Sequence, residues 1–209
     1  MVIETLKMPT VAEVDVLGDE ILRIPASYEE YLEWEEKCAF NISYFNNEIT
    51  IMGNASYYHE KLVADIIFCL KGLFKKNPIF TILGSNLKIH VPDPLSPDDF
   101  NADVSVIEGE PEFITLPSGK KSIGTILNPI LVVEVLSKST MSVDLGDKLS
   151  AYKKIPTLQY TLFINQYESF ITVYERKGPH HWELRDYIQS EESFLIFGQP
   201  VTVAEIYSK

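Results

Sequence analysis

The sequence predicts a layered domain of helices and strands, of the α/β or α+β class. Two segments carry apolar residues at helical spacing, and several short runs rich in branched and aromatic residues flank both of them. The chain has 209 residues, 45% of them hydrophobic, which suffices for one domain with a buried core. We therefore expect an N-terminal lead-in at residues 1–26 and a single domain at residues 27–209, within which no stretch has the composition of a linker.

In the first half of the chain, an extended lead-in precedes a short helix. Ser27 and Glu30 have the spacing of a capping box, so this helix should run from Ser27 to about Cys38. The partly alternating stretch NISYFNNEITIMG turns at its Asn-Asn pair, which predicts a β-hairpin. The further elements expected here are a long helix from Ser56 to about Lys76, strands at 79–83, 87–91 and 101–107, and a proline-rich loop at 92–100.

The second half contains the strand with the densest apolar run, at residues 130–136. Both of its faces are apolar, which is typical of a central, covered strand. The residues before it, 108–129, are rich in Pro, Gly and Lys and are expected to form a long irregular connection. After it we expect a helix capped within 137–140 and running to about Lys154, strands at 159–164, 170–175 and 181–188, and a closing strand or short helix at 201–207.

The composition is acidic, with a net charge of −12. Such a surface repels nucleic acid and argues against a non-specific DNA coat protein. It does not argue against an enzyme whose carboxylates bind cations that in turn contact phosphates. No apolar run approaches the length of a membrane span, and the N-terminus lacks the unbroken apolar stretch of a signal peptide. Cys38 and Cys69 have no paired spacing. We expect a cytoplasmic protein with reduced cysteines and no membrane partner.

Glu134 lies in the middle of the most apolar strand. Because side chains alternate along a strand, it should point the same way as Val132 and Leu136. An ionised carboxylate in a covered strand is costly unless it is compensated by a buried Lys or Arg, by a raised pKa that leaves it neutral, or by a metal ion. The alternative is structural: Glu134 is two residues from the end of the strand and could reach water there.

Asp103 is a second carboxylate in a strand-like segment. It alternates with apolar Ala102 and Val104, and an acid near the start of one strand can converge with Glu134 on a neighbouring strand. Two or three carboxylate oxygens at one point are what Mg²⁺ or Mn²⁺ prefers. The alternative for Asp103 is an exposed position at the edge of a sheet.

The helix after Glu134 carries Asp144, Lys148 and Tyr152 at spacing i, i+4 and i+8, so the three side chains share one face. A helix that begins directly after a strand packs back across it, and Lys148 could then bring a positive charge beside the two carboxylates. The alternative is a solvent-exposed Asp144–Lys148 ion pair that contributes only a few tenths of a kcal/mol.

Two strand carboxylates followed by a lysine resemble the PD-(D/E)xK nuclease superfamily, which has the restriction-endonuclease-like fold. More closely, the chain resembles the Uma-type endonucleases from about residue 27 to 207. The most specific element is the strand Val133–Ser137, which reads VEVLS. The other matching positions are Glu48 in the hairpin, His59 at the start of the long helix, Asp103 in its strand, and Asp144, Lys148 and Tyr152 on the later helix.

The chain also departs from the family pattern. Ala102 stands where the motif has proline, a residue that carries no chemistry there, and Asn47 replaces a turn glycine. Leu136 occupies the superfamily's lysine position two residues after the second acid. Lys148 would therefore have to act from the helix.

The resemblance implies a restriction-endonuclease-like core, a mixed central β-sheet flanked by two main helices. It implies an endonuclease that hydrolyses phosphodiester bonds in DNA, acts as a homodimer, and holds Mg²⁺ (or Mn²⁺) on Asp103 and Glu134. Lys148 would orient or deprotonate the attacking water, and Glu48 would add an outer carboxylate. His59 would contact substrate or metal, or else be a surface histidine at a helix start. Ser137, Asp144 and Tyr152 would contact phosphate or support the ligands.

Two other functions compete with this one. The first is a catalytically inactive module with the nuclease fold that binds nucleic acid or protein without cutting. The second is a different hydrolase, but the chain has no G-x-S-x-G, H-E-x-x-H, Walker or Rossmann motif. His180 and His181 have no pair of acids near them in the sequence, so the sequence does not favour a zinc site at these histidines.

Overall fold

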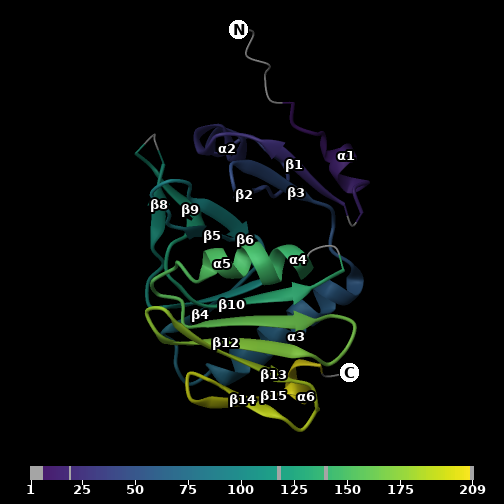
Figure 1. The fold of residues 1–209 in the computed structure, drawn as a ribbon, viewed down its shortest axis with the longest axis vertical. Coiled ribbons are helices and arrows are strands. Elements are labelled where there is room, and N and C mark those ends of the chain that lie inside the picture. The colour runs from purple at the N-terminus through teal and green to yellow at the C-terminus, as the bar shows by residue number, and fades with distance from the viewer. Residues whose placement is uncertain (1–6, 19, 117–118, 139–140, 208–209) are drawn as a thin grey trace.

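The computed structural model describes residues 7–18, 20–116, 119–138 and 141–207. Two sheets lie one above the other (Figure 1). In spatial order, the upper sheet consists of β1 (Ile21–Pro25), β3 (Glu48–Met52), β2 (Ser43–Phe45), β6 (Asp98–Asn101), β5 (Lys88–Val91), β9 (Lys121–Ile126) and β8 (Phe113–Thr115). The lower sheet consists of β13 (His181–Tyr187), β12 (Ile171–Gly178), β11 (Tyr160–Asn165), β10 (Pro129–Leu136), β7 (Val104–Glu108) and β4 (Phe80–Gly84). A separate hairpin pairs β14 (Ser193–Ile196) with β15 (Gln199–Thr202).

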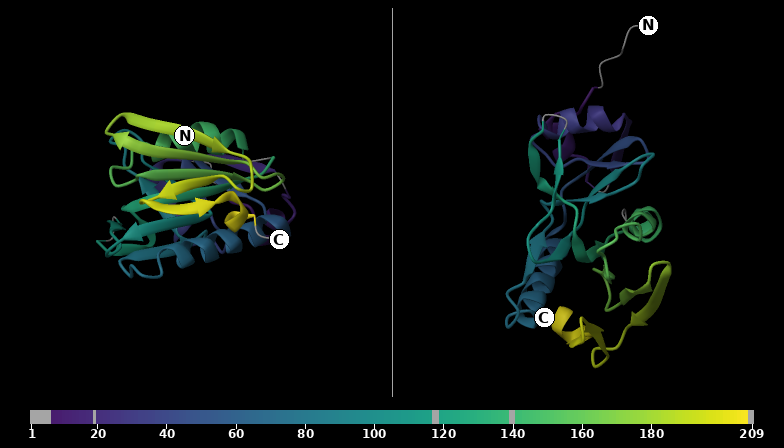
Figure 2. Two further views of the ribbon diagram at one scale, coloured as in Figure 1. Left: turned by 90° about the horizontal axis from the view of Figure 1, so that it is seen from below. Right: turned by 90° about the vertical axis from the view of Figure 1, so that its left-hand side faces the viewer.

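The lower sheet is mixed, because β10 runs parallel to β11 while its other pairs are antiparallel. The long helix α3 (Tyr57–Leu73) covers one face of this sheet. The other face meets a helical segment made of α4 (Met141–Val143), the π-helical turn η1 (Asp144–Lys148) and α5 (Leu149–Tyr152), which lies between the two sheets (Figure 2). The predicted α+β fold, a mixed sheet flanked by two main helices, is confirmed.

Two hydrophobic clusters hold these layers together. On the α3 side, Leu62, Ile66 and Leu70 pack against the inner residues of β7, β10 and β11. On the other side, Val132 of β10 packs with Tyr152 and with residues of β5 and β6 from the upper sheet. Strand β10 is therefore buried along its whole length, as the dense apolar run predicts.

The predicted caps and the predicted turn are present. Ser27 caps α2 (Tyr28–Glu35) in a capping box with Glu30, and Ser56 caps α3 by accepting a hydrogen bond from the His59 backbone N–H at 3.2 Å. Asn46 and Asn47 have φ values of 52° and 62°. Consecutive left-handed residues form the tight turn whose twist suits a two-residue β-hairpin.

Several predicted elements were wrong, because short strands that are fixed by their pairing partners have no clear pattern of their own in the sequence. The lead-in contains a short helix, α1 (Val11–Asp15), and strand β1, which pairs with β3. The segment predicted as a loop at 92–100 includes most of β6, and the predicted irregular connection at 108–129 contains β8 and β9. Residues 201–207, predicted as a closing strand or short helix, do contain the end of β15 and a short helix, α6 (Val203–Ile206). The residues at 139–140, part of the predicted helix cap, lie outside the described residues.

Strand β6 shows why such a segment is hard to recognise. Its Asp99 is completely buried, which an acidic residue in a sequence does not suggest. The carboxylate accepts a hydrogen bond from the Tyr28 hydroxyl at 2.8 Å and contacts Nδ1 of His90 at 2.8 Å. These partners come from α2 and β5, so only tertiary structure makes the burial of Asp99 favourable. Among the described helices, none is long and apolar enough to cross a membrane.

Candidate active site

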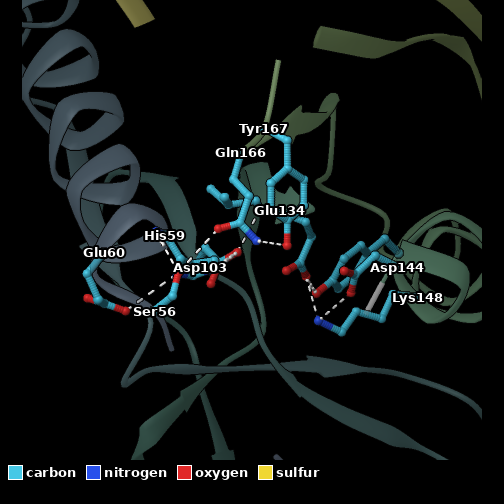
Figure 3. A network of polar contacts seen from close by, with 11 residues as sticks. Ser56, His59, Glu60, Asp103, Glu134, Asp144, Lys148, Gln166 and Tyr167 are labelled. Carbon is cyan, nitrogen blue, oxygen red and sulfur yellow. Dashed lines mark hydrogen bonds and ion pairs between the residues drawn. The ribbon is translucent and has the colours of Figure 1, made fainter. Parts of the chain in front are cut away.

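A pocket of about 390 Å³ opens where the two sheets meet the start of α3. Its walls come from the carboxyl end of β10, the bend before β7, the turn η1 and the loop after β11. It brings together six of the residues predicted from the sequence: His59, Asp103, Glu134, Ser137, Asp144 and Lys148. Figure 3 shows five of these, all but Ser137, around one centre, with His59 on α3 and Lys148 on the opposite helical segment.

Asp103 lies in the bend just before β7 and not within the predicted strand. Its Oδ2 accepts a hydrogen bond from the Val135 backbone N–H at 2.6 Å. The pairing of β7 with β10 ends at Val104 and Val133. Beyond this pair, the Asp103 carboxylate takes the place of a backbone carbonyl as the acceptor for a β10 N–H. This bond holds Asp103 directly beside Glu134.

Glu134 is 2% exposed, so it does not reach bulk water from the strand end. Its Oε1 accepts hydrogen bonds from Lys148 Nζ at 3.1 Å and from the Tyr152 hydroxyl at 2.5 Å. Burial raises the pKa of Glu134 to about 8, although Lys148 acts to lower it. Two of the compensations considered for a buried acid, a lysine and a raised pKa, therefore occur together.

Lys148 forms a second ion pair, with Asp144 Oδ1 at 2.9 Å. Burial alone would lower the pKa of Lys148, but Asp144 and Glu134 more than offset this effect and raise it well above its usual value. Lys148 is therefore a permanent cation. Asp144 and Lys148 are 2% and 5% exposed, so the alternative of a solvent-exposed pair is wrong.

The helix that carries this pair has an unusual local geometry. From Asp144 to Lys148 it is π-helical, and the Leu149 backbone N–H donates to the Asp144 carbonyl, five residues earlier. Such single turns interrupt α-helices rarely and are common at functional sites. Tyr152, one turn beyond Lys148, is fully buried and contacts Glu134 without lining the pocket.

His59 contacts Asp103 through its imidazole. Nε2 lies 3.3 Å from Asp103 Oδ2, and Nδ1 lies 3.5 Å from Glu60 Oε1. Burial acts to lower the pKa of His59, but the hydrogen bond that His59 donates to Asp103 and the negative charge of Asp103 raise it overall. With a side chain only 14% exposed, His59 is not the surface histidine of the alternative interpretation.

Glu48 is the predicted site residue that lies away from the pocket, whereas Tyr152, which does not line the pocket either, contacts Glu134. Glu48 begins β3, whose opposite end, Met52, lines the pocket, so the two residues are about 13 Å apart along the strand. Its carboxylate pairs with Arg23 at 3.3 Å. Within the described parts of the chain, no group of three or more His, Cys, Asp or Glu side chains forms a ready metal site.

Three residues that close the pocket above the carboxylates, Ser56, Gln166 and Tyr167, were not predicted as site residues from the sequence. Ser56 Oγ donates to Gln166 Oε1 at 3.4 Å, and Gln166 Nε2 donates to the Tyr167 hydroxyl at 3.1 Å. Gln166 and Tyr167 could have been predicted from their position directly after β11. The carboxyl ends of the parallel strands β10 and β11 lie at the same edge of the sheet, where Glu134 is also found.

Comparison with known proteins identifies the family of the chain. The model of the Uma2 family, described as "Putative restriction endonuclease", matches residues 28–201. The chain belongs to the Uma2 family. Two Synechocystis proteins, both named only as uncharacterized, are relatives: sll1609 is 30% identical over 75% of this chain and 84% of its own, and slr1290 is 32% identical over 79% and 82%.

A solved structure shares the fold. It is a crystal structure described as a putative nuclease belonging to DUF820, from Anabaena variabilis. It aligns with a TM-score of 0.67 and 14% identity over 88% of this chain and 98% of that one. This Uma2 chain therefore has a nuclease-like fold, and its pocket lies in that fold.

Proposed function

We propose that this Uma2 protein is a Mg²⁺-dependent endonuclease (with Mn²⁺ as a substitute) that hydrolyses phosphodiester bonds in DNA. The single observation that carries the proposal is the convergence of Asp103, Glu134 and Lys148 on one pocket, from two neighbouring strands and a helix. We further propose that it works in the cytoplasm, where Cys38 and Cys69, which form no disulfide, would stay reduced.

The two carboxylates suit a hard divalent cation. Among the described residues, the hydrogen bonds to Asp103 fall on Oδ2 and those to Glu134 fall on Oε1, which leaves one oxygen of each carboxylate for a cation. Mg²⁺ commonly binds through one or two carboxylates and keeps several waters. When bound, it would lower the pKa of a coordinated water and withdraw charge from the phosphate.

The residues around the carboxylates have separate tasks in this proposal. Lys148, held by Asp144 and permanently charged, stabilises the negative charge that develops on the phosphate, which favours the electrostatic role over that of a base. Tyr152 fixes the Glu134 carboxylate by its hydrogen bond. His59 fixes Asp103 in the same way and is a positioning residue.

Cleavage of supercoiled plasmid DNA and of circular single-stranded DNA in the presence of Mg²⁺ tests the proposal. Asp103→Ala, Glu134→Ala and Lys148→Ala should each lower the rate at least about 100-fold, which is the scale observed when one electrostatic group is removed from an active site. Glu183→Ala and Lys177→Ala remove surface charges on β13 and β12 and are the matched controls. Robust cleavage in EDTA, or full activity of the three variants, would contradict the proposal.

The same variants separate an enzyme from an inactive binding module. A module would bind DNA with no metal-dependent cleavage to lose, and the three substitutions would leave its affinity unchanged. We also propose that the enzyme is a homodimer, because nucleases with sites of this type often act in pairs. Light scattering coupled to gel filtration should give twice the 23.8 kDa of one chain.

A further inference from the structure

The pocket has an aromatic rim, formed by Tyr57, Tyr58 and Tyr167, to which the proposed mechanism gives no role. Tyr58 and Tyr167 line the pocket beside the carboxylates. Tyr57 packs edge-on against Tyr58, with ring centroids 5.5 Å apart. The three side chains are 75%, 72% and 58% exposed, in chain order, although such large rings are usually buried.

The rim is held in place by polar contacts. Ser56 precedes the two tyrosines on α3 and hydrogen-bonds Gln166, which in turn donates to the Tyr167 hydroxyl. Figure 3 shows this chain of contacts running from the start of α3 to Tyr167 above Glu134. Lys138 lies 5.5 Å from the centre of the Tyr167 ring. Hydrogen bonds therefore connect the start of α3, which carries Tyr57 and Tyr58, to the loop that carries Tyr167.

The charge of the pocket does not suit a ligand held mainly through its phosphates. Among the described residues that line it, the acids Glu20, Asp103, Glu134 and Asp144 outnumber the basic side chains His59 and Lys148. Both basic side chains already have acidic partners: Lys148 contacts Glu134 and Asp144, and His59 contacts Asp103. Proteins that hold duplex DNA use many Lys and Arg contacts to phosphate, whereas stacking on aromatic rings does not depend on charge.

Stacking requires a free base. In a duplex both faces of every internal base are covered by its neighbours, so an aromatic ring can stack on such a base only after neighbouring base pairs are unstacked or the base is flipped out, both of which cost free energy. In a single strand each base can lie on an aromatic side chain. A rim directly beside the reacting groups would therefore fix the nucleotides that flank the bond to be cut.

We infer that the substrate is single-stranded DNA, or an unpaired segment of a duplex, whose bases stack on Tyr58 and Tyr167. This inference rests on the proposed function and narrows its substrate. It requires that the pocket bind DNA mainly through its bases, with Lys138, beside Tyr167, as an additional phosphate partner.

Fluorescence anisotropy in EDTA tests the inference without cleavage. A labelled dT12 strand should bind at least 10-fold tighter than a 12-base-pair duplex. Tyr58→Ala and Tyr167→Ala should each weaken binding of the strand about 5- to 100-fold, the range for loss of one stacked base. Tyr58→Phe and Tyr167→Phe keep the ring and should bind like the parent protein.

Phe68→Ala is the matched control, because Phe68 is 82% exposed on the same helix, about 15 Å along it from Tyr58, and does not line the pocket. Equal or tighter binding of the duplex, no measurable binding of the strand, or unchanged affinity of both alanine variants would overturn the inference. Metal-dependent cleavage of duplex DNA that is unaffected by the alanine variants would overturn it and leave the proposed function standing. Strand binding as expected with no cleavage would overturn only the proposed function.

Discussion

Glu134 is a carboxylate inside a buried strand, and its neighbours determine which charge it carries. Lys148 and Tyr152 both donate to it, yet removal from water has the larger effect on its pKa. The folded protein therefore holds a proton on Glu134 at pH values where the unfolded chain has released it. Binding of a divalent cation by this carboxylate must release that proton, so Mg²⁺ affinity should increase as the pH rises towards 8.

The same pKa predicts how stability depends on pH. The pKa of Glu134 is about 8 in the folded protein, above the ordinary value of 4.5, so its contribution to stability is full below about pH 4.5 and is lost as the pH rises through 8. In EDTA, Glu134→Gln should be the more stable protein at pH 9, by roughly 3 to 5 kcal/mol, with a difference that shrinks towards pH 4.5. Urea unfolding at pH 5, 7 and 9 measures this.

Glu183→Gln, on the exposed strand β13, is the control for that experiment and should follow the pH profile of the parent protein. Parallel profiles for Glu134→Gln and the parent protein would show that Glu134 is ionised when folded. In that case the hydrogen bonds from Lys148 and Tyr152 would outweigh burial.

The elements around the pocket meet at a close contact between two glycines. Gly53 follows β3 and Gly18 follows α1, and both line the pocket. A Cβ atom added at Gly53 would lie 2.2 Å from the carbonyl oxygen of Gly18. Since the obstacle is backbone, no side chain can move aside. This wall of the pocket thus depends on the absence of a side chain at Gly53.

Gly53→Ala should therefore destabilise the protein by about 1 to 3 kcal/mol, the usual effect of overpacking, and lower the rate of DNA cleavage. Gly72→Ala is the matched control: Gly72 is on α3, and an added Cβ there meets nothing within 4 Å. In a helix, Ala is favoured over Gly by up to about 1 kcal/mol, so the two substitutions should have opposite signs in thermal unfolding. Destabilisation of equal size in both would contradict the proposed contact.

The elements that could be predicted from the sequence are those whose signals are local. Caps such as Ser27 and Ser56, the Asn46-Asn47 turn and the apolar run of β10 depend on neighbours in the chain. Strands β6, β8 and β9 could not be predicted, because their pairing partners determine them. In the site, Asp103, Glu134 and Lys148 were found because a charge beside apolar residues is conspicuous, whereas Tyr167 was not, because an aromatic residue in a loop has no such contrast.

At the scale of the whole molecule, the net charge of −12 limits how DNA can be held. Surface charges are screened beyond about 8 Å at physiological ionic strength, so their repulsion is weak at a distance but persists near the pocket. The basic side chains among the described residues that line the pocket are Lys148 and His59, and both already contact carboxylates. Few counterions should therefore be released when DNA binds, and affinity should come from stacking and from the bound metal ion.

This predicts a shallow dependence of binding on salt. One or two phosphate contacts to a single strand give a slope of log affinity against log salt of about −0.7 to −1.4. Titrations of dT12 from 50 to 300 mM KCl, followed by anisotropy in EDTA, should fall in that range. Lys138→Ala should reduce the slope by about 0.7 if Lys138 contacts phosphate beside Tyr167, and Lys177→Ala, on β12, should not change it. A slope steeper than about −3 would mean that phosphates and not bases dominate binding, which the acidic pocket could not explain.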